Sequence, residues 1–154
     1  MIQRIIFGLG SNLGDREFHL EEAIYQLENN LNLKNPKKSK TLKNPAMLLP
    51  NSPKEWELEF LNMAFSADIN LKEFAPEKIL EIVKEIEKKI GRIDREKWAP
   101  REIDIDILAI NDMHIHFAER LIIPHPGLIH RDFFLKTVEE IEPEILKKLQ
   151  AILS

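Results

Sequence analysis

Apolar residues recur at every second position in two stretches of this chain, a pattern that predicts β-strands. In residues 58–69 the alternation places Phe60 and Asn62 on one strand face and a row of apolar side chains on the other. In residues 103–107 three isoleucines alternate with two aspartates. Shorter apolar runs predict two further strands, at residues 5–9 and 121–123.

Spacings of three and four residues between apolar positions predict amphipathic helices. Asp15 is the expected N-cap of a first helix, Pro76 begins a second, and Gly91 ends it. Two terminal helices are expected, at residues 131–140 and 143–153. Because residues 44–56 carry three prolines, we expect them to form a long surface loop.

The order of these elements predicts the fold class. Helices follow both single strands and strand pairs, which is not a strict β-α-β repeat, so an all-parallel sheet is not expected. We predict an α+β fold, a ferredoxin-like α/β/α sandwich on a largely antiparallel sheet. The chain has 154 residues, a length that suits a single domain over residues 1–154.

Composition and charge exclude several classes of protein. The chain has no cysteine, which excludes a disulfide framework and a thiolate metal site. Its formal net charge of −4 does not favour nucleic acid as a partner. No apolar stretch approaches the ~20 residues of a membrane-spanning helix, and the N-terminus lacks the features of a signal peptide. We expect a cytoplasmic monomer that acts on small molecules.

Five lysines lie within residues 34–43. A run of this kind is typical of a solvated strand edge or loop. The alternative is a diffuse positive field that draws in an anionic ligand.

Asp104 and Asp106 are the most informative pair in the sequence. Residues two apart in a strand share a face, so both carboxylates project together while the isoleucines enter the core. Two like charges this close repel unless a cation lies between them or water screens them. Oxygen ligands from one or two carboxylates, completed by phosphate oxygens, are typical of Mg²⁺ sites. The alternative is an exposed amphipathic strand whose polar residues face solvent.

Arg92 and Arg101 bracket the segment Trp98-Ala99-Pro100, close to the two aspartates. Guanidinium groups bind phosphate in a bidentate manner and stabilise charge on a transferring phosphoryl group. The charged segment 93–97 could form a lid that delivers these arginines when substrate binds. Taken singly, each arginine also fits a weak surface ion pair, and Trp98 fits a partly buried anchor.

Three other features are open to two interpretations each. The segment Gly8–Asp15 predicts the end of the first strand, at Gly8 and Gly10, and a tight turn whose backbone amides could face a ligand. His125 lies between two stiffening prolines and is either structural or a donor to phosphate. Phe133 on its own merits favours the core.

Taken together, these segments resemble the 6-hydroxymethyl-7,8-dihydropterin pyrophosphokinases of the folate pathway. The similarity extends from residue 8 to about residue 143, nearly the whole chain. Six segments in order carry it: Gly10–Arg16, Phe60–Asn62, Gly91-Arg92, Trp98–Ile107, Ile123–Pro126 and Arg131–Phe133.

The resemblance implies a magnesium-dependent enzyme that transfers pyrophosphate from ATP to the hydroxymethyl group of the pterin and releases AMP. It implies that Asp104 and Asp106 bind two Mg²⁺ ions. Arg92 and Arg101 would be catalytic, and Trp98 would pack at the closed site.

The resemblance also assigns the two substrates. Asn62 would hydrogen-bond the pterin edge, and the pterin ring would stack between Phe60 and Phe133. Four residues would contact ATP: Glu87, Arg120, His125 and Arg131.

Four places depart from the family pattern. Ala99 replaces a usual glycine, and Phe60 replaces a frequent tyrosine. The span from Arg92 to Trp98 is short, so the counterparts of Asp94, Arg95 and Lys97 are open. The 44–56 loop aligns only loosely. Two other functions remain as alternatives: a non-catalytic module that senses a nucleotide or metabolite, and a metal-dependent phosphodiesterase.

Overall fold

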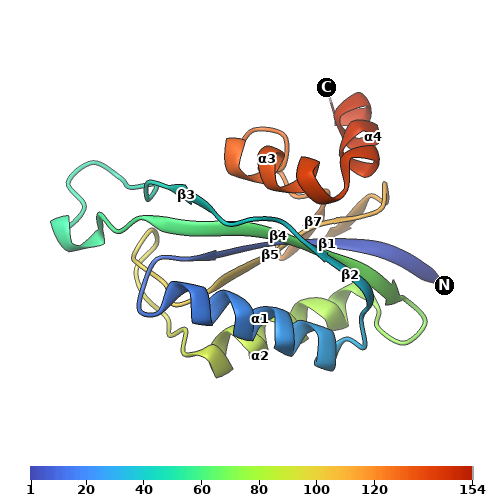
Figure 1. Cartoon of the computed structure of the whole chain (residues 1–154), viewed down its shortest axis with the longest axis horizontal. Helices are drawn as coiled ribbons and strands as arrows, with labels where there is room; N and C mark the ends of the chain where they lie inside the picture. The colour runs from blue at the N-terminus through green and yellow to red at the C-terminus, as the bar shows by residue number, and fades with distance from the viewer. Residues whose placement is uncertain (154) are drawn as a thin grey trace.

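The computed structural model describes residues 1–153 as a five-stranded antiparallel sheet between two layers of helices (Figure 1). The strands lie in the order β2-β4-β1-β5, and β3 also pairs with β4. The elements are β1 (Ile2–Ser11), α1 (Arg16–Asn30), β2 (Lys34–Lys38), β3 (Leu42–Asn44), the short 3₁₀ helix η1 (Lys54–Trp56), β4 (Phe60–Asn70), α2 (Pro76–Ile90), β5 (Asp104–Ile110), β6 (Ile115–Phe117), β7 (Leu121–Ile123), α3 (Asp132–Ile141) and α4 (Pro143–Leu153).

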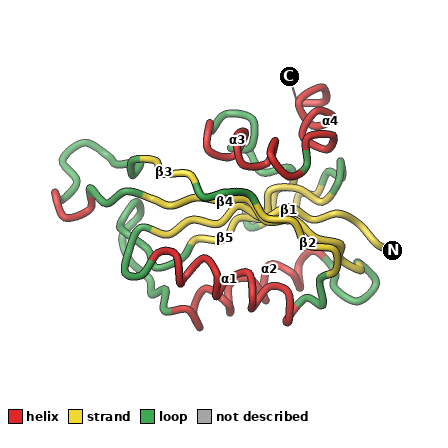
Figure 2. The backbone as a smooth tube through the Cα atoms, in the orientation of Figure 1, coloured by secondary structure: helices red, strands yellow, loops and turns green. Residues whose placement is uncertain are grey.

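The topology confirms the predicted α+β sandwich. Elements β1, α1, β2, β4, α2 and β5 follow one another as the β-α-β-β-α-β unit of ferredoxin-like folds, and all their strand pairings are antiparallel. Helices α1 and α2 cover one face of the sheet, and α3 and α4 lie over the other (Figure 2).

The sheet separates two hydrophobic cores. The larger core, under α1 and α2, receives Leu61, Met63 and Phe65 from β4, the face that the alternation predicted. The smaller core, under α3 and α4, includes Leu108 and Phe134. Burying each large apolar side chain contributes roughly 1.5–3 kcal/mol, so both helical layers hold the sheet in place and leave one of its ends for a site.

The local signals at the helix ends are confirmed. The Asp15 side chain accepts a hydrogen bond from the Phe18 N–H at 3.2 Å and caps α1. Pro76 begins α2, and Gly91, at φ +122°, ends it in a conformation that suits glycine. No helix within residues 1–153 is long and apolar enough to cross a membrane.

One strand prediction is wrong in its extent, and another is confirmed. The predicted end of the first strand at Gly8 and Gly10 is wrong: β1 continues to Ser11 because Gly10 pairs with Asn62 on one side and Asp104 on the other. The short strand at residues 121–123 exists, but it pairs with the unpredicted β6 in a separate hairpin.

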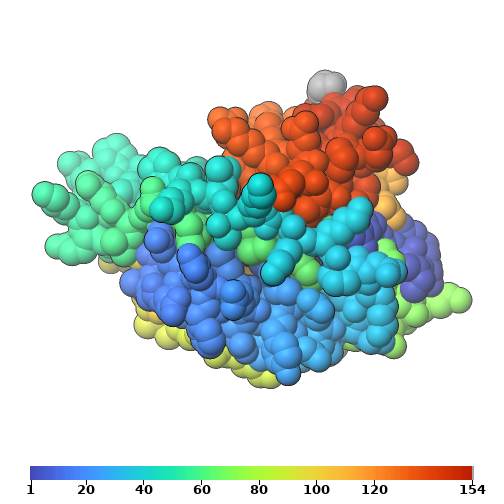
Figure 3. Space-filling model, viewed as in Figure 1, coloured from blue at the N-terminus to red at the C-terminus, as the bar shows by residue number. Residues whose placement is uncertain are grey.

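The lysine-rich segment forms the outer strand β2, whose five residues are all exposed. Lysines on an exposed strand edge discourage pairing with another chain, which is the solvated-edge interpretation. The following loop, residues 45–59, projects from one end of the molecule (Figure 3), as its prolines predicted.

Candidate active site

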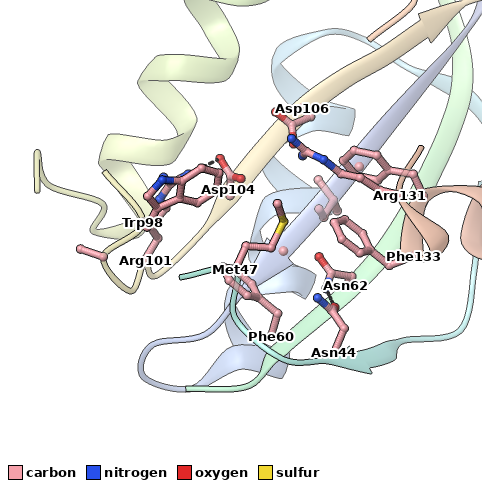
Figure 4. Close-up of a pocket in the computed structure, with 15 residues that line it drawn as sticks. Asn44, Met47, Phe60, Asn62, Trp98, Arg101, Asp104, Asp106, Arg131 and Phe133 are labelled. Atoms are coloured by element: carbon pink, nitrogen blue, oxygen red, sulfur yellow. Dashed lines mark hydrogen bonds and ion pairs between the residues drawn. The ribbon is translucent and has the colours of Figure 1, made fainter. Parts of the chain in front are cut away.

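A cavity opens beside the end of the sheet from which the 45–59 loop projects (Figure 4). Its wall combines strand residues from β1, β3, β4 and β5 with residues from the start of α3 and from two loops, 45–59 and 91–103. Eight of the twelve side chains selected from the sequence line it: Phe60, Asn62, Trp98, Arg101, Asp104, Asp106, Arg131 and Phe133.

The floor of the cavity is formed by glycines inside β1. A Cβ atom at Gly10 would lie 2.8 Å from Asn62 Oδ1, and one at Gly8 would lie 2.9 Å from the Phe134 ring. Both distances are shorter than real contacts allow, so side chains here would fill the space. Asn62 and Asp104 both pair with Gly10, from opposite sides. The glycine therefore sits between the amide and the carboxylate of the site.

One half of the cavity is aromatic and carries an amide. Phe60, Met47 and Phe133 lie around Asn62 (Figure 4). Asn62 is only 8% exposed, and its Nδ2 donates a hydrogen bond to Asn44 Oδ1. This half is shaped for a flat ring with polar edges.

The other half of the cavity is charged. Asp104 and Asp106 share a face of β5, as the alternation predicted, and their side chains are 28% and 30% exposed. Asp104 Oδ1 contacts Nη1 of Arg92 at 2.9 Å and Nη1 of Arg101 at 3.3 Å. His125 Nε2 lies 3.7 Å from Asp106 Oδ1.

Burial raises the pKa of Asp104 above its ordinary value, and the negative charge of Asp106 adds to this rise. Arg101, Arg92 and Lys84 act in the opposite direction. The protein therefore only partly compensates the two facing carboxylates, and a bound cation would favour their charged forms.

Glu87 and Arg92 lie behind the charged wall rather than in the cavity lining. Glu87 is 3% exposed, and its Oε2 accepts from the Ile105 N–H at 2.8 Å and from Arg92 Nη1 at 2.7 Å. Burial raises the pKa of Glu87. Arg92 thus connects a helix carboxylate to Asp104 on the neighbouring strand.

An ion pair within the 91–103 loop, which carries Trp98 and Arg101, connects the middle of the loop to its end. Both carboxylate oxygens of Glu102 accept hydrogen bonds from the Arg95 guanidinium, each at 2.8 Å. This pair lowers the pKa of Glu102 below its usual value. Trp98 occupies a left-handed conformation, φ +71°, next to Ala99.

Arg120 is exposed in the turn before β7 and does not line the cavity. Four lining residues were not selected from the sequence: Leu9, Asn44, Met47 and Phe134. Gly8 and Gly10 were expected in a turn rather than inside a strand. Because residues two apart in a strand share a face, extending the first strand to Gly10 would have placed both glycines on one side of it. No sequence signal marks Met47.

Comparisons with known proteins agree on one family. The model of the 7,8-dihydro-6-hydroxymethylpterin-pyrophosphokinase (HPPK) family matches residues 6–143. A 2-amino-4-hydroxy-6-hydroxymethyldihydropteridine pyrophosphokinase of Aquifex aeolicus is 39% identical over 146 residues, which cover 92% of this chain and 82% of the relative. The equally named protein of Bacillus subtilis is 34% identical over 91% of this chain and 78% of its own length.

Some relatives are longer. A folate synthesis bifunctional protein of Chlamydia muridarum is 37% identical over 90% of this chain, which spans only 30% of that protein. Among solved structures, wild-type HPPK-DHPS of Plasmodium falciparum with pteroate superposes with a TM-score of 0.63 and 16% identity, over 99% of this chain and 42% of that one. The structural likeness supports the fold.

Proposed function

Because the chain belongs to the 7,8-dihydro-6-hydroxymethylpterin-pyrophosphokinase family, we propose that it transfers pyrophosphate from ATP to the hydroxymethyl group of 6-hydroxymethyl-7,8-dihydropterin. The hydroxymethyl oxygen attacks the β-phosphorus of ATP, the bond from that phosphorus to the α,β-bridging oxygen breaks, and AMP leaves. One observation carries the proposal: a single cavity joins an aromatic, amide-bearing half to a half with two aspartates, and two arginines also line it.

The aromatic half binds the pterin in this proposal. The ring stacks between Phe60 and Phe133, and the Asn62 amide hydrogen-bonds to its polar edge. A buried amide that loses its partner is costly, so Asn62 would select strongly for a ring with matching donors and acceptors. Trp98, on the loop at the cavity mouth, packs against the bound substrates.

Asp104 and Asp106 would hold Mg²⁺, with two ions expected. The fit rests on donor chemistry: both ligands are carboxylates on one strand face, and Mg²⁺ prefers oxygen. No group of three metal-ligating side chains was found among residues 1–153, so phosphate oxygens and water would complete the coordination. When bound, the ions neutralise phosphate charge and orient the phosphates for in-line displacement.

Arg101 is the proposed phosphate-binding guanidinium, since it lines the cavity beside Asp104. Arg92 would act from behind Asp104, where Glu87 holds it. Arg131 lines the cavity and His125 lies beside Asp106, so both could donate to ATP. Arg120 remains a proposed nucleotide contact. The expected contact of Glu87 with ATP is not supported, because its side chain is 3% exposed and is bonded to Arg92 and to the Ile105 N–H. A single domain, a monomeric state and a cytoplasmic location remain predictions.

The test is to incubate the protein with ATP, Mg²⁺ and 6-hydroxymethyl-7,8-dihydropterin and to separate the nucleotides. We expect AMP and a pterin diphosphate in equal amounts, and no turnover after chelation of the metal. ADP as the product would contradict the proposal. Metal-independent nucleotide binding without turnover would instead support a sensor.

A further inference from the structure

Asn12, the first residue after β1, is a buried polar residue that the proposed chemistry does not use. It is 3% exposed and does not line the cavity. It follows the strand that lies between β4 and β5, and the strand pairings of β1 end at Ser11 with Leu61 and at Gly10 with Asp104. Asn12 therefore lies directly beyond the last paired residues of β1 on both sides.

Three hydrogen bonds join Asn12 to both neighbouring chain segments. Its backbone N–H donates to the Arg101 carbonyl at 3.2 Å, and its Oδ1 accepts from the Arg101 N–H at 2.8 Å. Its Nδ2 donates to the Leu58 carbonyl at 3.2 Å. One carboxamide thus extends the contacts of the central strand to both sides, beyond the last paired residues.

Leu58 and Arg101 lie near the ends of the two loops that border the cavity. Leu58 belongs to the 45–59 loop and lies just before Phe60, which lines the aromatic half. Arg101 belongs to the 91–103 loop, and its guanidinium lies 3.3 Å from Asp104 Oδ1. Any shift at Leu58 or Arg101 moves a side chain of the site.

We propose that Asn12 is a positioning residue that holds Phe60 and Arg101 on opposite sides of the cavity. The inference rests on the proposed function of that cavity. A carboxamide offers an acceptor and a donor at once, so it can bind the Arg101 N–H and the Leu58 carbonyl together. A carboxylate of the same shape keeps only the acceptor, and alanine keeps neither.

Substitutions at Asn12 can therefore test its contact to Arg101 and its contact to Leu58 separately. Asn12→Asp retains the acceptor for Arg101 but loses the donor to Leu58. We expect its KM for the pterin to rise roughly tenfold, with kcat and the KM for ATP within about twofold of wild type. Asn12→Ala also removes the side-chain acceptor of the Arg101 N–H and leaves only the backbone hydrogen bond to the Arg101 carbonyl, so we expect kcat to fall in addition by about 10- to 100-fold.

Hydrogen exchange gives a readout that does not depend on turnover. Asn12→Asp should accelerate amide exchange in the 45–59 loop only, whereas Asn12→Ala should accelerate it in both loops. Asn29→Ala is the matched control, because Asn29 is exposed on α1 and its side chain donates to the Tyr25 carbonyl. This control should leave kinetics and exchange unchanged.

The outcomes distinguish this inference from the proposed function. A wild-type protein that releases no AMP contradicts the proposed function, while the exchange pattern still tests Asn12. The inference is overturned if both variants keep wild-type constants and exchange. It is equally overturned if their activity falls only in proportion to the unfolded fraction. Should the alanine variant not fold, the aspartate variant decides alone.

Discussion

The protein buries two arginine–glutamate pairs at opposite ends of its sheet, and only one of them serves the cavity. At the far end, Arg4 Nε donates to Glu142 Oε2 at 2.6 Å. At the site, Arg92 Nη1 donates to Glu87 Oε2 at 2.7 Å. The glutamates are 9% and 3% exposed, so each needs its arginine to be stable in the protein.

The pairs differ in what else the arginine contacts. Arg4 also donates to the Asn35 carbonyl, to Asp68 and to the Ser66 hydroxyl, which in turn donates to Glu142. Each polar group of this far network is therefore bonded to another group of the protein. Arg92 instead shares its guanidinium with Asp104, which lies in the cavity wall.

The pKa shifts of the two aspartates follow from this difference. Hydrogen bonds from Asn35 and Arg4 lower the pKa of Asp68. Burial and the neighbouring Asp106 raise the pKa of Asp104. A closed network stabilises its charges by itself, whereas the site network holds a carboxylate that a ligand can stabilise further.

The largest expected effect is on activity alone. Asp106→Asn removes a carboxylate proposed to bind Mg²⁺ and should lower kcat/KM by roughly 10²- to 10³-fold. Its melting temperature should not fall, because the facing charge of Asp104 loses a repulsive neighbour. Steady-state AMP release and calorimetric melting measure both. Asp112→Asn, at an exposed turn, is the control; an Asp106 variant with full activity would refute the metal assignment.

The far network should show the reverse behaviour. Glu142→Ala leaves Arg4 without its buried carboxylate partner and should lower the free energy of unfolding by about 3 kcal/mol. The activity of the folded fraction should stay at the wild-type level. Urea unfolding and active-site titration give the two quantities. Exposed Glu144→Ala should change neither, and a selective loss of kcat in the Glu142 variant would break the comparison.

Glu87→Gln should give an intermediate result, because this residue links the core to the site. The variant weakens the contact to Arg92, so we expect about 1 kcal/mol of lost stability and roughly a fivefold lower kcat from the displaced arginine. Glu85→Gln, exposed on the same helix, provides the baseline. A stability loss with unchanged kcat would assign Glu87 to the core alone.

The smallest effect is on the pH dependence of stability. A lowered folded-state pKa means that Asp68 contributes stability above its unfolded pKa of about 3.9. That contribution is lost as pH falls through the folded value. Asp68→Asn should therefore lose less stability than wild type between pH 5 and about pH 3. Parallel acid unfolding curves for the two proteins would show that the charge of Asp68 is not stabilised.

Local patterns were enough to predict most of the fold and the strand-borne part of the site. Alternation separated Phe60 and Asn62 from the core face of β4 and placed Asp104 together with Asp106. These inferences succeed because the period of a strand decides which face each residue occupies. The strand β6 was missed because its three residues, Ile115–Phe117, include a polar residue and two exposed ones, whereas the predicted β7 is a continuous apolar run.

The contacts between distant segments could not be predicted in this way. The position of Gly10 inside β1 depends on pairing with Asn62 and Asp104, which are far away in sequence. The link from Asn12 to Leu58 and Arg101 depends on where two loops meet. Only the folded chain defines such positions, so the glycine-rich segment was taken for a simple turn.

The central claim is that this cavity transfers the β- and γ-phosphates of ATP together. The most direct measurement follows ATP radiolabelled at the β-phosphate during a single turnover with the pterin and Mg²⁺. We predict that the label appears in the pterin product while unlabelled AMP is released. Label that remains with the nucleotide, as ADP, would contradict it.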